Sequence, residues 1–349
     1  MSGDLRARML ALHRAHIAPY SIVSLDPPIF YVQLHGDGLE QFVDRFHVLF
    51  TALRGRPAYC LLCYGFHPGP WAMPAIERLQ AQCAARFPDV QLIHLCNEPE
   101  QPSPLRARGY QAEFCNQNCL VDEAIFAPNA SIAKRFDAVY DARLSAVKRH
   151  HLAHDIASLA LIYYPFPLDD PTYVQMVHEQ LAHAHRFNET ADGAFALLSP
   201  HDVNRALNAC RVGLCLSAEE GSMLASMQYL LSGVPVVTAP SVGGRTVFFT
   251  DDCVITAEPD ARAIRDAVQV MIDRDLTPER VRASALPLLR QHRQTFMDVV
   301  QRLYDTHHVR RTFADEWPRV FFHTMLRNQR HHDTIALLAQ ADAKAALRS

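Results

Sequence analysis

The stretch that decides the fold is residues 208–250, NACRVGLCLSAEEGSMLASMQYLLSGVPVVTAPSVGGRTVFFT. It contains two apolar runs, RVGLCLS (211–217) and VPVVTAP (234–240), each of the length and composition of a buried strand. The amphipathic segment between them ends at Gly233, where a left-handed glycine commonly closes a helix. A strand, a helix and a second strand in this order indicate a βαβ unit and a parallel sheet.

Short apolar runs alternate with longer amphipathic segments along the rest of the chain. Helical spacing is clear in residues 38–55, GLEQFVDRFHVLFTALRG, whose apolar residues recur every three or four positions. A polar segment with a proline, 127–135, separates two such series and is interpreted as a hinge. The other expected strands are 28–35, 58–66, 90–96, 112–121, 136–143 and 159–166.

This alternation predicts an α/β protein with two Rossmann-like domains, each built on a parallel sheet. A chain of 349 residues also exceeds what one hydrophobic core usually supports. We expect an N-terminal domain at 1–127, a C-terminal domain at 136–310 and terminal helices at 311–349. Residues 316–340 have apolar positions at helical spacing with basic residues between them. Packing of these helices back onto the first domain is the favoured interpretation, and docking on a membrane surface is the alternative.

The composition is that of an ordinary globular protein, with 49% hydrophobic and 20% charged residues. The net charge of −3 gives no electrostatic reason to expect nucleic acid as a partner. No run approaches the about 18 apolar residues of a membrane span. The nine cysteines are an odd number, and arginines interrupt the apolar residues of the N-terminus, unlike in a signal peptide. We therefore expect free thiols and a cytoplasmic protein, with peripheral contact to the inner face of the membrane as an option.

The residues after the first apolar run of 208–250 have the chemistry of a binding site. Ligands of open α/β sheets bind beyond the carboxyl ends of the strands, where an acidic loop with Glu220 is followed by Gly221 and Ser222, which are expected to open a helix. The free N–H groups and the positive dipole end of such a helix favour a diphosphate. Glu220 would repel phosphate and is therefore expected to face hydroxyl groups. The alternative is a capped, acidic first turn with no ligand.

The same segment resembles the C-terminal domain of GT-B glycosyltransferases, in particular the retaining family four (glycosyl transferases group 1). The resemblance implies that Glu220 binds the transferred sugar and that the amides of Gly221 and Ser222 approach the donor. The second glutamate of the family pattern corresponds to Gln228, which implies weakened or retuned binding of the ribose. The positions that match the family pattern are Ser217, Glu220, Gly221, Gly233, Pro235, Val236 and Val237, followed by the glycine pair Gly243 and Gly244.

A second match lies in VYDARLSAVKRHHLA, where Arg143 ends an expected strand and Lys148 starts an expected helix. The family has an arginine and a lysine at these positions. As the glycosidic bond breaks, negative charge develops on the departing diphosphate, and two fixed cations stabilise it without a metal. Asp169 and Asp170 lie in a proline-flanked loop and are interpreted as a helix-capping pair, not as a metal motif. The alternative for Arg143 and Lys148 is a solvated start of a helix.

The first half resembles the family less closely. NQNCLVDEAIFAP (116–128) is similar to the segment that closes the N-terminal sheet of the family, and its role is expected to be architectural. Gly36 and Gly38 follow an expected strand where the family has a glycine-rich loop, although a plain tight turn explains them equally well. His67 ends the next strand, where the family often has an active-site histidine. The alternative is a histidine in a rigid Pro-Gly-Pro loop.

The resemblance implies a GT-B glycosyltransferase with its active site in the cleft between two domains. The donor would be a nucleoside-diphosphate sugar and the acceptor a saccharide, a lipid-linked or another hydroxyl compound. Transfer would proceed with retention and without a metal or another cofactor, and the histidines show no convincing metal-ligand spacing. A nucleotide-sugar-binding pseudoenzyme and a GT-B nucleotide-sugar epimerase stay open as alternatives. The sequence does not predict the oligomeric state.

Overall fold

The structure, a computed structural model, describes residues 17–35, 38–166 and 169–346. The chain divides into two compact units, the first made of residues up to 120 together with those from 291 onward, and the second of residues 121–290. The divisions predicted from the sequence, at 127–136 and at 310, differ from these by several to about twenty residues. The two units are described separately below.

Unit 1 contains a six-stranded sheet in the order β12-β1-β2-β3-β4-β5. Strands β2 to β5 are parallel, whereas β1 runs antiparallel to both of its neighbours. The strands are β1 (Ile17–Leu25), β2 (Pro28–Leu34), β3 (Ala58–Tyr64), β4 (Val90–Cys96), β5 (Gln111–Phe114) and β12 (Asn328–Arg330). The helices are α2 (Gly38–Ala52), α3 (Met73–Arg86), α4 (Pro102–Arg106), α10 (Phe313–Val320), α11 (His331–Ala346) and, from residue 291, α9 (Pro278–Thr306). Short 3₁₀ turns are η1 (Pro70–Ala72), η2 (Gln117–Leu120) and η6 (His323–Met325).

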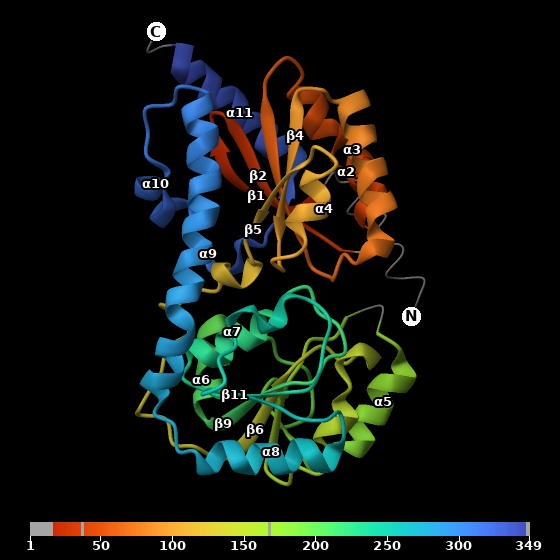
Figure 1. Ribbon diagram of the computed structural model, residues 1–349, viewed down its shortest axis with the longest axis vertical. Helices are drawn as coiled ribbons and strands as arrows, with labels where there is room; N and C mark the ends of the chain where they lie inside the picture. Colours follow the sequence, from red (N-terminus) through yellow and green to blue (C-terminus); the bar gives the residue numbers. More distant parts are fainter. Residues whose placement is uncertain (1–16, 36–37, 167–168, 347–349) are drawn as a thin grey trace. The chain divides into compact units, whose positions relative to one another are not determined.

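The sheet of unit 1 has helices on both faces. On β2, Phe30 and Val32 pack in the cluster that includes α2, α3 and α11, while Ile29 and Tyr31 pack with α9 and α10. This alternation follows from the two-residue period of a strand. Because both faces of the sheet are covered, the inner strands β2, β3 and β4 consist largely of apolar residues, and this explains why they are recognisable in the sequence. Helix α9 is the longest helix of the described chain (Figure 1).

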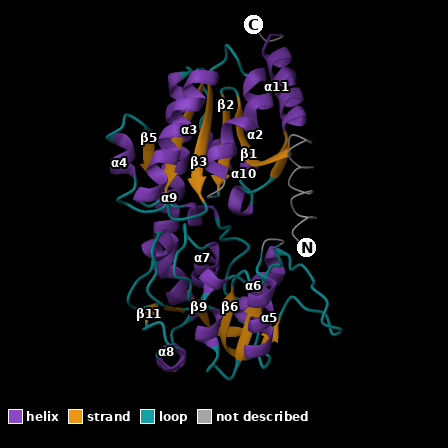
Figure 2. Ribbon diagram, turned by 90° about the vertical axis from the view of Figure 1, so that its right-hand side faces the viewer, coloured by secondary structure: helices purple, strands orange, loops and turns teal. Residues whose placement is uncertain are grey.

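Unit 2 is built on a second six-stranded sheet, in the order β11-β10-β9-β6-β7-β8, with every pair parallel. Figure 2 shows its helices around the sheet. The strands are β6 (Phe136–Asp141), β7 (Leu159–Ile162), β8 (His185–Arg186), β9 (Cys210–Cys215), β10 (Val236–Thr238) and β11 (Val254–Thr256). The helices are α5 (Pro171–Gln180), α6 (Pro200–Asn208), α7 (Leu224–Leu231) and α8 (Ala261–Asp273), and the 3₁₀ turns are η3 (Ala146–Lys148), η4 (His150–Ala153) and η5 (Gly244–Phe248).

Two helices predicted in unit 2 differ from the structure. The segment after β6 forms the turns η3 and η4 instead of an α-helix, because Arg149 has a φ of +52° and the Tyr140 hydroxyl donates to the carbonyl of Lys148 (2.5 Å). Helix α7 begins at Leu224, after Met223 with a φ of +59°, so Gly221 and Ser222 precede the helix and do not open it. Its predicted end is confirmed, since Gly233 has a φ of +75°.

The nine cysteines are buried and free, in agreement with the expectation of unpaired thiols. Within the described residues, none of the helices combines the length and the apolar character needed to cross a membrane.

Candidate active site

Two of the predicted residues, Lys148 and Glu220, meet at the carboxyl ends of the unit 2 strands. Lys148 follows β6 in η3, and Glu220 lies in the loop that follows β9. The ammonium group of Lys148 forms an ion pair with Oε1 of Glu220, and the Ser217 hydroxyl donates to the same oxygen at 2.5 Å. The side chains of Lys148 and Glu220 are only 19% and 11% exposed, so this charge pair is largely shielded from solvent. The structure thus brings together three residues that the sequence analysis singled out.

Two arginines hold the backbone around this pair. Arg245 is fully buried and donates to the carbonyls of Ser217 (3.1 Å) and Ala239 (2.6 Å). Arg149 donates to the carbonyls of Leu216 (2.6 Å), Ser217 (2.9 Å) and Pro240 (3.0 Å). Burial, with the nearby charge of Arg245, lowers the pKa of the Arg149 guanidinium. The loops after β9 and β10 are therefore joined by two guanidinium groups, which also bring positive charge to the strand ends.

The glycine pair Gly243–Gly244 lies against the loop that carries Glu220. The N–H of Glu220 donates to the carbonyl of Val242, and the N–H of Gly244 donates to the carbonyl of Gly221, each at 3.0 Å. Gly243 has a φ of +108°, and a Cβ there would lie 1.7 Å from the carbonyl oxygen of Glu220. Only glycine fits at this position, because a side chain would displace the Glu220 loop.

Asp141 is a buried carboxyl group at the carboxyl end of β6. Burial raises its pKa to about 7, although the charge of Lys148 acts in the opposite direction. The backbone N–H of Asp141 donates to the hydroxyl of Tyr229 on α7 (2.6 Å). Tyr229 packs so closely on β9 that a Cβ at Gly213 would lie 2.4 Å from its ring. Helix α7 and the end of β6 are thus fixed to each other beside the Lys148–Glu220 pair.

Arg143, the second predicted cation, has different partners in the structure. Its Nε lies 3.0 Å from Oδ1 of Asp169, and its guanidinium lies over the ring of Phe166 at 4.7 Å from the centroid. Asp170, but not Asp169, caps α5 by accepting from the N–H of Thr172 at 2.9 Å. The predicted capping pair is therefore wrong for Asp169. Arg143 keeps 43% of its side chain exposed.

The remaining predicted donor residues lie on or before α7. Gln228 is half-buried in the helix, and Gly221 and Ser222 are buried in the loop between Glu220 and the helix. The amides of this loop belong to an irregular segment that is tied to the Gly243 loop. Any donor contact of Gly221 or Ser222 would therefore come from loop backbone and not from a helix end.

His67 and Gly38 belong to unit 1. His67 follows β3, and its Nδ1 lies 2.6 Å from Oε1 of Glu98, which follows β4. The N–H of Gly38 donates to the carbonyl of His35 (2.8 Å) at the start of α2, as in a tight turn. Gly36 lies outside the described residues.

Comparisons with known proteins identify the fold. No family model and no curated protein matches the sequence. The Anabaena protein HepE in complex with UDP is similar with a TM-score of 0.55 and 14% identity, over 76% of this chain and 84% of that chain. Sucrose-phosphate synthase from Thermosynechococcus elongatus gives a TM-score of 0.51 and 16% identity, over 75% and 79%. The α,α-trehalose 6-phosphate synthase of Burkholderia multivorans gives 0.51 and 14%, over 80% and 71%.

This chain has the GT-B fold. The predicted fold class, two Rossmann-like domains with parallel sheets, is confirmed. The TM-scores of 0.51–0.55 establish a shared fold, and identities of 14–16% do not establish a shared reaction. The reaction therefore has to be argued from the residues of this chain.

Sequence reasoning missed four charged residues that lie beside the predicted site residues or contact them, namely Asp141, Arg149, Arg245 and Glu98. Asp141 and Glu98 each stand at or just after the end of an apolar run, where an unexpected carboxylate is a usable signal. Arg149 and Arg245 directly follow predicted residues, Lys148 and Gly244. Their roles depend on carbonyl groups of other loops, and no local pattern reveals such contacts.

The structure gives no candidate metal centre within residues 17–35, 38–166 and 169–346, since no three His, Cys, Asp or Glu side chains gather there as ligands. The absence of a metal requirement stays a prediction.

Proposed function

We propose that this protein transfers a sugar from a nucleoside-diphosphate sugar to an acceptor hydroxyl, with retention at the anomeric carbon and without a metal. The observation that carries the proposal is the ion pair of Lys148 with Glu220 at the carboxyl ends of parallel strands. A cation there suits a phosphate, and a carboxylate beside it suits the hydroxyl groups of a sugar. A nucleoside-diphosphate sugar carries both phosphate and hydroxyl groups. It would therefore offer Lys148 and Glu220 better-matched partners than each side chain is for the other.

The donor would separate the two partners. Lys148 would turn from Glu220 to the diphosphate and stabilise the charge that develops on it as the glycosidic bond breaks. Glu220 would then accept hydrogen bonds from the hydroxyl groups of the sugar. The Ser217 hydroxyl would continue to donate to Oε1 of Glu220. Arg149 and Arg245 keep the two loops in place and add positive potential, so less of the site has to be rearranged during the reaction. Arg143 would supply the second cation by leaving Asp169.

The ligands in similar structures indicate which donor to test first. HepE was solved with UDP and also with UDP-glucose. We propose a uridine donor on this basis, and Gln228 as the side chain that binds its ribose. The acceptor would be a saccharide, a lipid-linked alcohol or another hydroxyl compound.

Turnover of donor sugars tests the proposal. The protein is incubated with UDP-, GDP- and dTDP-sugars, with and without a broad set of hydroxyl acceptors, and in the presence and absence of a chelator. Release of the nucleoside diphosphate with formation of a glycoside of unchanged anomeric configuration supports the proposal. A sugar that is isomerised without an acceptor indicates an epimerase, and binding without turnover indicates a pseudoenzyme. Complete loss of activity in chelator contradicts the metal-free mechanism.

Gln228→Glu tests the proposed ribose contact. A charged acceptor strengthens a hydrogen bond to a hydroxyl by about 1 kcal/mol compared with a neutral one, so UDP affinity should rise about fivefold. Calorimetric titration with UDP measures it. Gln180→Glu, an exposed residue of α5 with the same change of charge, serves as the control and should leave the affinity unchanged. Equal or weaker binding by Gln228→Glu would show that Gln228 does not hold the ribose.

A further inference from the structure

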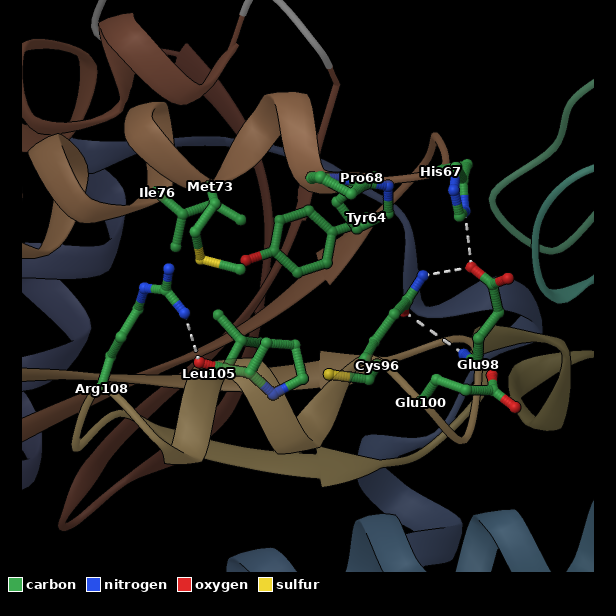
Figure 3. A pocket seen from close by; sticks show the side chains of 14 residues that line it. Tyr64, His67, Pro68, Met73, Ile76, Cys96, Glu98, Glu100, Leu105 and Arg108 are labelled. Atoms are coloured by element: carbon green, nitrogen blue, oxygen red, sulfur yellow. Dashed lines mark hydrogen bonds and ion pairs between the residues drawn. The ribbon is translucent and has the colours of Figure 1, made fainter.

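A pocket of about 320 Å³ opens in unit 1 beyond the carboxyl ends of β3 and β4. Its volume is at the lower end of the range for small-molecule sites, about 300–1,000 Å³. Figure 3 shows Met73 and Ile76 of α3 with Tyr64 on one side, and Leu105 with Cys96 on the other. The lining is predominantly apolar. Burial of an apolar ligand here would be favourable by about 25 cal/mol per Å² of apolar surface.

The wall of this pocket is neutral where Tyr64 forms it. The Tyr64 hydroxyl lies 2.5 Å from Nδ1 of the buried His94, and Nε2 of His94 lies 2.6 Å from the amide nitrogen of Gln80. Burial lowers the pKa of His94 to about 4, so its ring is neutral at physiological pH. The Tyr64 hydroxyl is thus already engaged by His94, and its ring serves as an apolar surface of the lining.

The polar groups of the pocket lie at its two ends (Figure 3). At one end Glu98 accepts from His67 at 2.6 Å and from the side-chain amide of Gln101, and the exposed Glu100 lies beside it. At the other end Arg108 is already paired with Glu77 at 2.5 Å and donates to the carbonyl of Pro104 at 2.9 Å. The end with His67 therefore carries two carboxylates, and no lysine or arginine of the lining lies beside them.

This charge pattern decides between classes of ligand. A phosphate or carboxylate group at the His67 end would meet the charges of Glu98 and Glu100 and be repelled. A hydroxyl group can instead donate to Glu98 or exchange a hydrogen bond with His67. The pocket therefore suits an uncharged molecule with an apolar body and a hydroxyl at one end.

We propose that this pocket binds the acceptor, and that the acceptor is a neutral alcohol or phenol on an apolar body. The inference rests on the proposed glycosyl transfer, because that reaction requires an acceptor hydroxyl. It narrows the acceptor class, since phosphorylated lipid carriers and free saccharides do not match the lining. His67 and Glu98 hold the hydroxyl, and Met73, Ile76 and Leu105 contact the apolar body.

Saturation-transfer NMR on the full-length protein tests the proposal with three probes, para-cyclohexylphenol, its phosphate monoester and glucose. UDP binding is measured on the same samples by calorimetry. We expect the phenol to bind, and the phosphate ester to bind at least about tenfold more weakly because it is repelled by Glu98 and Glu100. Competition of the phenol by glucose, or equal binding of the phosphate ester, would overturn the proposed class. Absence of phenol binding would overturn the pocket assignment.

Two variants locate the binding. Met73→Trp fills the pocket from a half-exposed position at the start of α3 and should weaken phenol binding at least about tenfold. Gln82→Trp, an exposed position of the same helix outside the lining, is the matched control and should change nothing. If Met73→Trp does not fold, Met73→Gln places a polar amide at the same position and should give a loss in the same direction. Unchanged binding in a folded Met73 variant would overturn the assignment.

The two proposals fail in different ways. UDP binding without phenol binding would remove the acceptor inference and leave the proposed function intact. Phenol binding without binding or turnover of any nucleotide sugar would remove the proposed function, and with it the role of the pocket as an acceptor site.

Discussion

At the scale of the residue, Lys148 has two candidate partners, the carboxylate of Glu220 and the diphosphate of a donor. Lys148→Met removes the charge while keeping an unbranched side chain, and it leaves Glu220 without its cation. If Lys148 stabilises the leaving group, turnover should fall about a hundred- to a thousandfold, as when one fixed donor is removed from an oxyanion site. Steady-state rates of nucleoside-diphosphate release measure this loss.

Arg211→Ala provides the control for the Lys148 variant. Arg211 is a half-exposed cation at the start of β9, at the opposite end of the same sheet. Its loss changes the net charge by the same amount. Turnover should stay within about twofold, because an exposed charge at the amino ends of the strands is screened from the site at their carboxyl ends. Equal losses in both variants would show that Lys148 acts only through net charge.

Asp141 gives a prediction on pH. Its pKa of about 7 lies above the ordinary value of 3.8, so the folded chain retains a proton that the unfolded chain has lost over this range. The free energy of unfolding should therefore fall as pH rises from about 4 to about 7, by up to about 4 kcal/mol. Asp141→Asn cannot ionise and should abolish that fall. The free energy of unfolding of the variant minus that of the wild type should therefore be larger at pH 8 than at pH 4. Urea unfolding at several pH values measures it.

Asp137 of the same strand is the matched comparison for Asp141. It is 46% exposed, and Asp137→Asn should leave the pH dependence of unfolding as it is in the wild type. If Asp141→Asn unfolds with the same pH dependence as the wild type, the carboxyl group is ionised in the folded state at neutral pH and the assignment is wrong.

The residues of the site differ in how far the sequence reveals them. Lys148 and Glu220 were singled out because they match the family pattern near the ends of two apolar runs, and the structure brings their side chains together. Their roles stay predictions. The partner of Arg143 could not, because Asp169 reaches it from the loop before α5. Asp141 looks like an ordinary polar residue in the sequence, and its raised pKa arises from burial, which only the tertiary structure supplies.

At the scale of the element, the loops after β9 and β10 depend on the close approach at Gly243. Gly243→Ala would place a Cβ 1.7 Å from the carbonyl oxygen of Glu220, at a φ of +108°. The Glu220 loop would have to move, and we expect a loss of about 3 kcal/mol or more in unfolding free energy. UDP affinity should fall with it if the loop holds the donor. Urea unfolding and calorimetry on the same sample measure both effects.

Gly193→Ala separates close contact from backbone strain. Gly193 also has a positive φ (+79°), but a Cβ there would meet no heavy atom within 4 Å. The variant should lose only about 1 kcal/mol, the cost of the left-handed conformation, and should bind UDP normally. A loss for Gly243→Ala that is no larger than for Gly193→Ala would mean that the two loops yield easily.

Elements that are buried on both faces could be predicted, and elements held by particular distant contacts could not. Strand β4 has the predicted bounds because its apolar run has no competing interpretation. The segment after β6 has helical spacing, yet the contacts of Tyr140 and Arg149 with backbone carbonyls keep it in 3₁₀ turns. Such side-chain contacts override intrinsic propensity, which is a weak preference.

At the scale of the whole molecule, the sequence predicted two successive α/β sheets but not which segments complete them. Strand β12 pairs with β1, so Arg330 lies opposite Ile17 from near the other end of the chain. Helix α11 packs on α2 in the same unit, in agreement with the favoured interpretation that the terminal helices pack on the first domain, but its partner helix was not predicted. Neither contact leaves a local pattern, since apolar spacing predicts that a helix has a buried face and not which partner covers it. The boundary between the two units at residue 290 falls inside one continuous helix, α9. Apolar spacing along this helix does not reveal which unit each part of it contacts.

Hydrogen exchange on the full-length protein tests how the two proposed ligands divide between the units. UDP should slow amide exchange around residues 146–149, 217–223 and 240–245, because a bound diphosphate would order the loops that carry Lys148, Glu220 and Gly243. The phenol should slow exchange at 65–73 and 97–108, the loops around the unit 1 pocket. Mass spectrometry of peptides from both units, with each ligand alone, measures these effects. Exchange at 328–346, a segment of unit 1 that contributes no residue to the lining of the pocket, is the internal control. Slower amide exchange with UDP at the unit 1 loops, but not at the loops of Lys148 and Glu220, would mean that the nucleotide binds unit 1. This result would contradict the donor assignment.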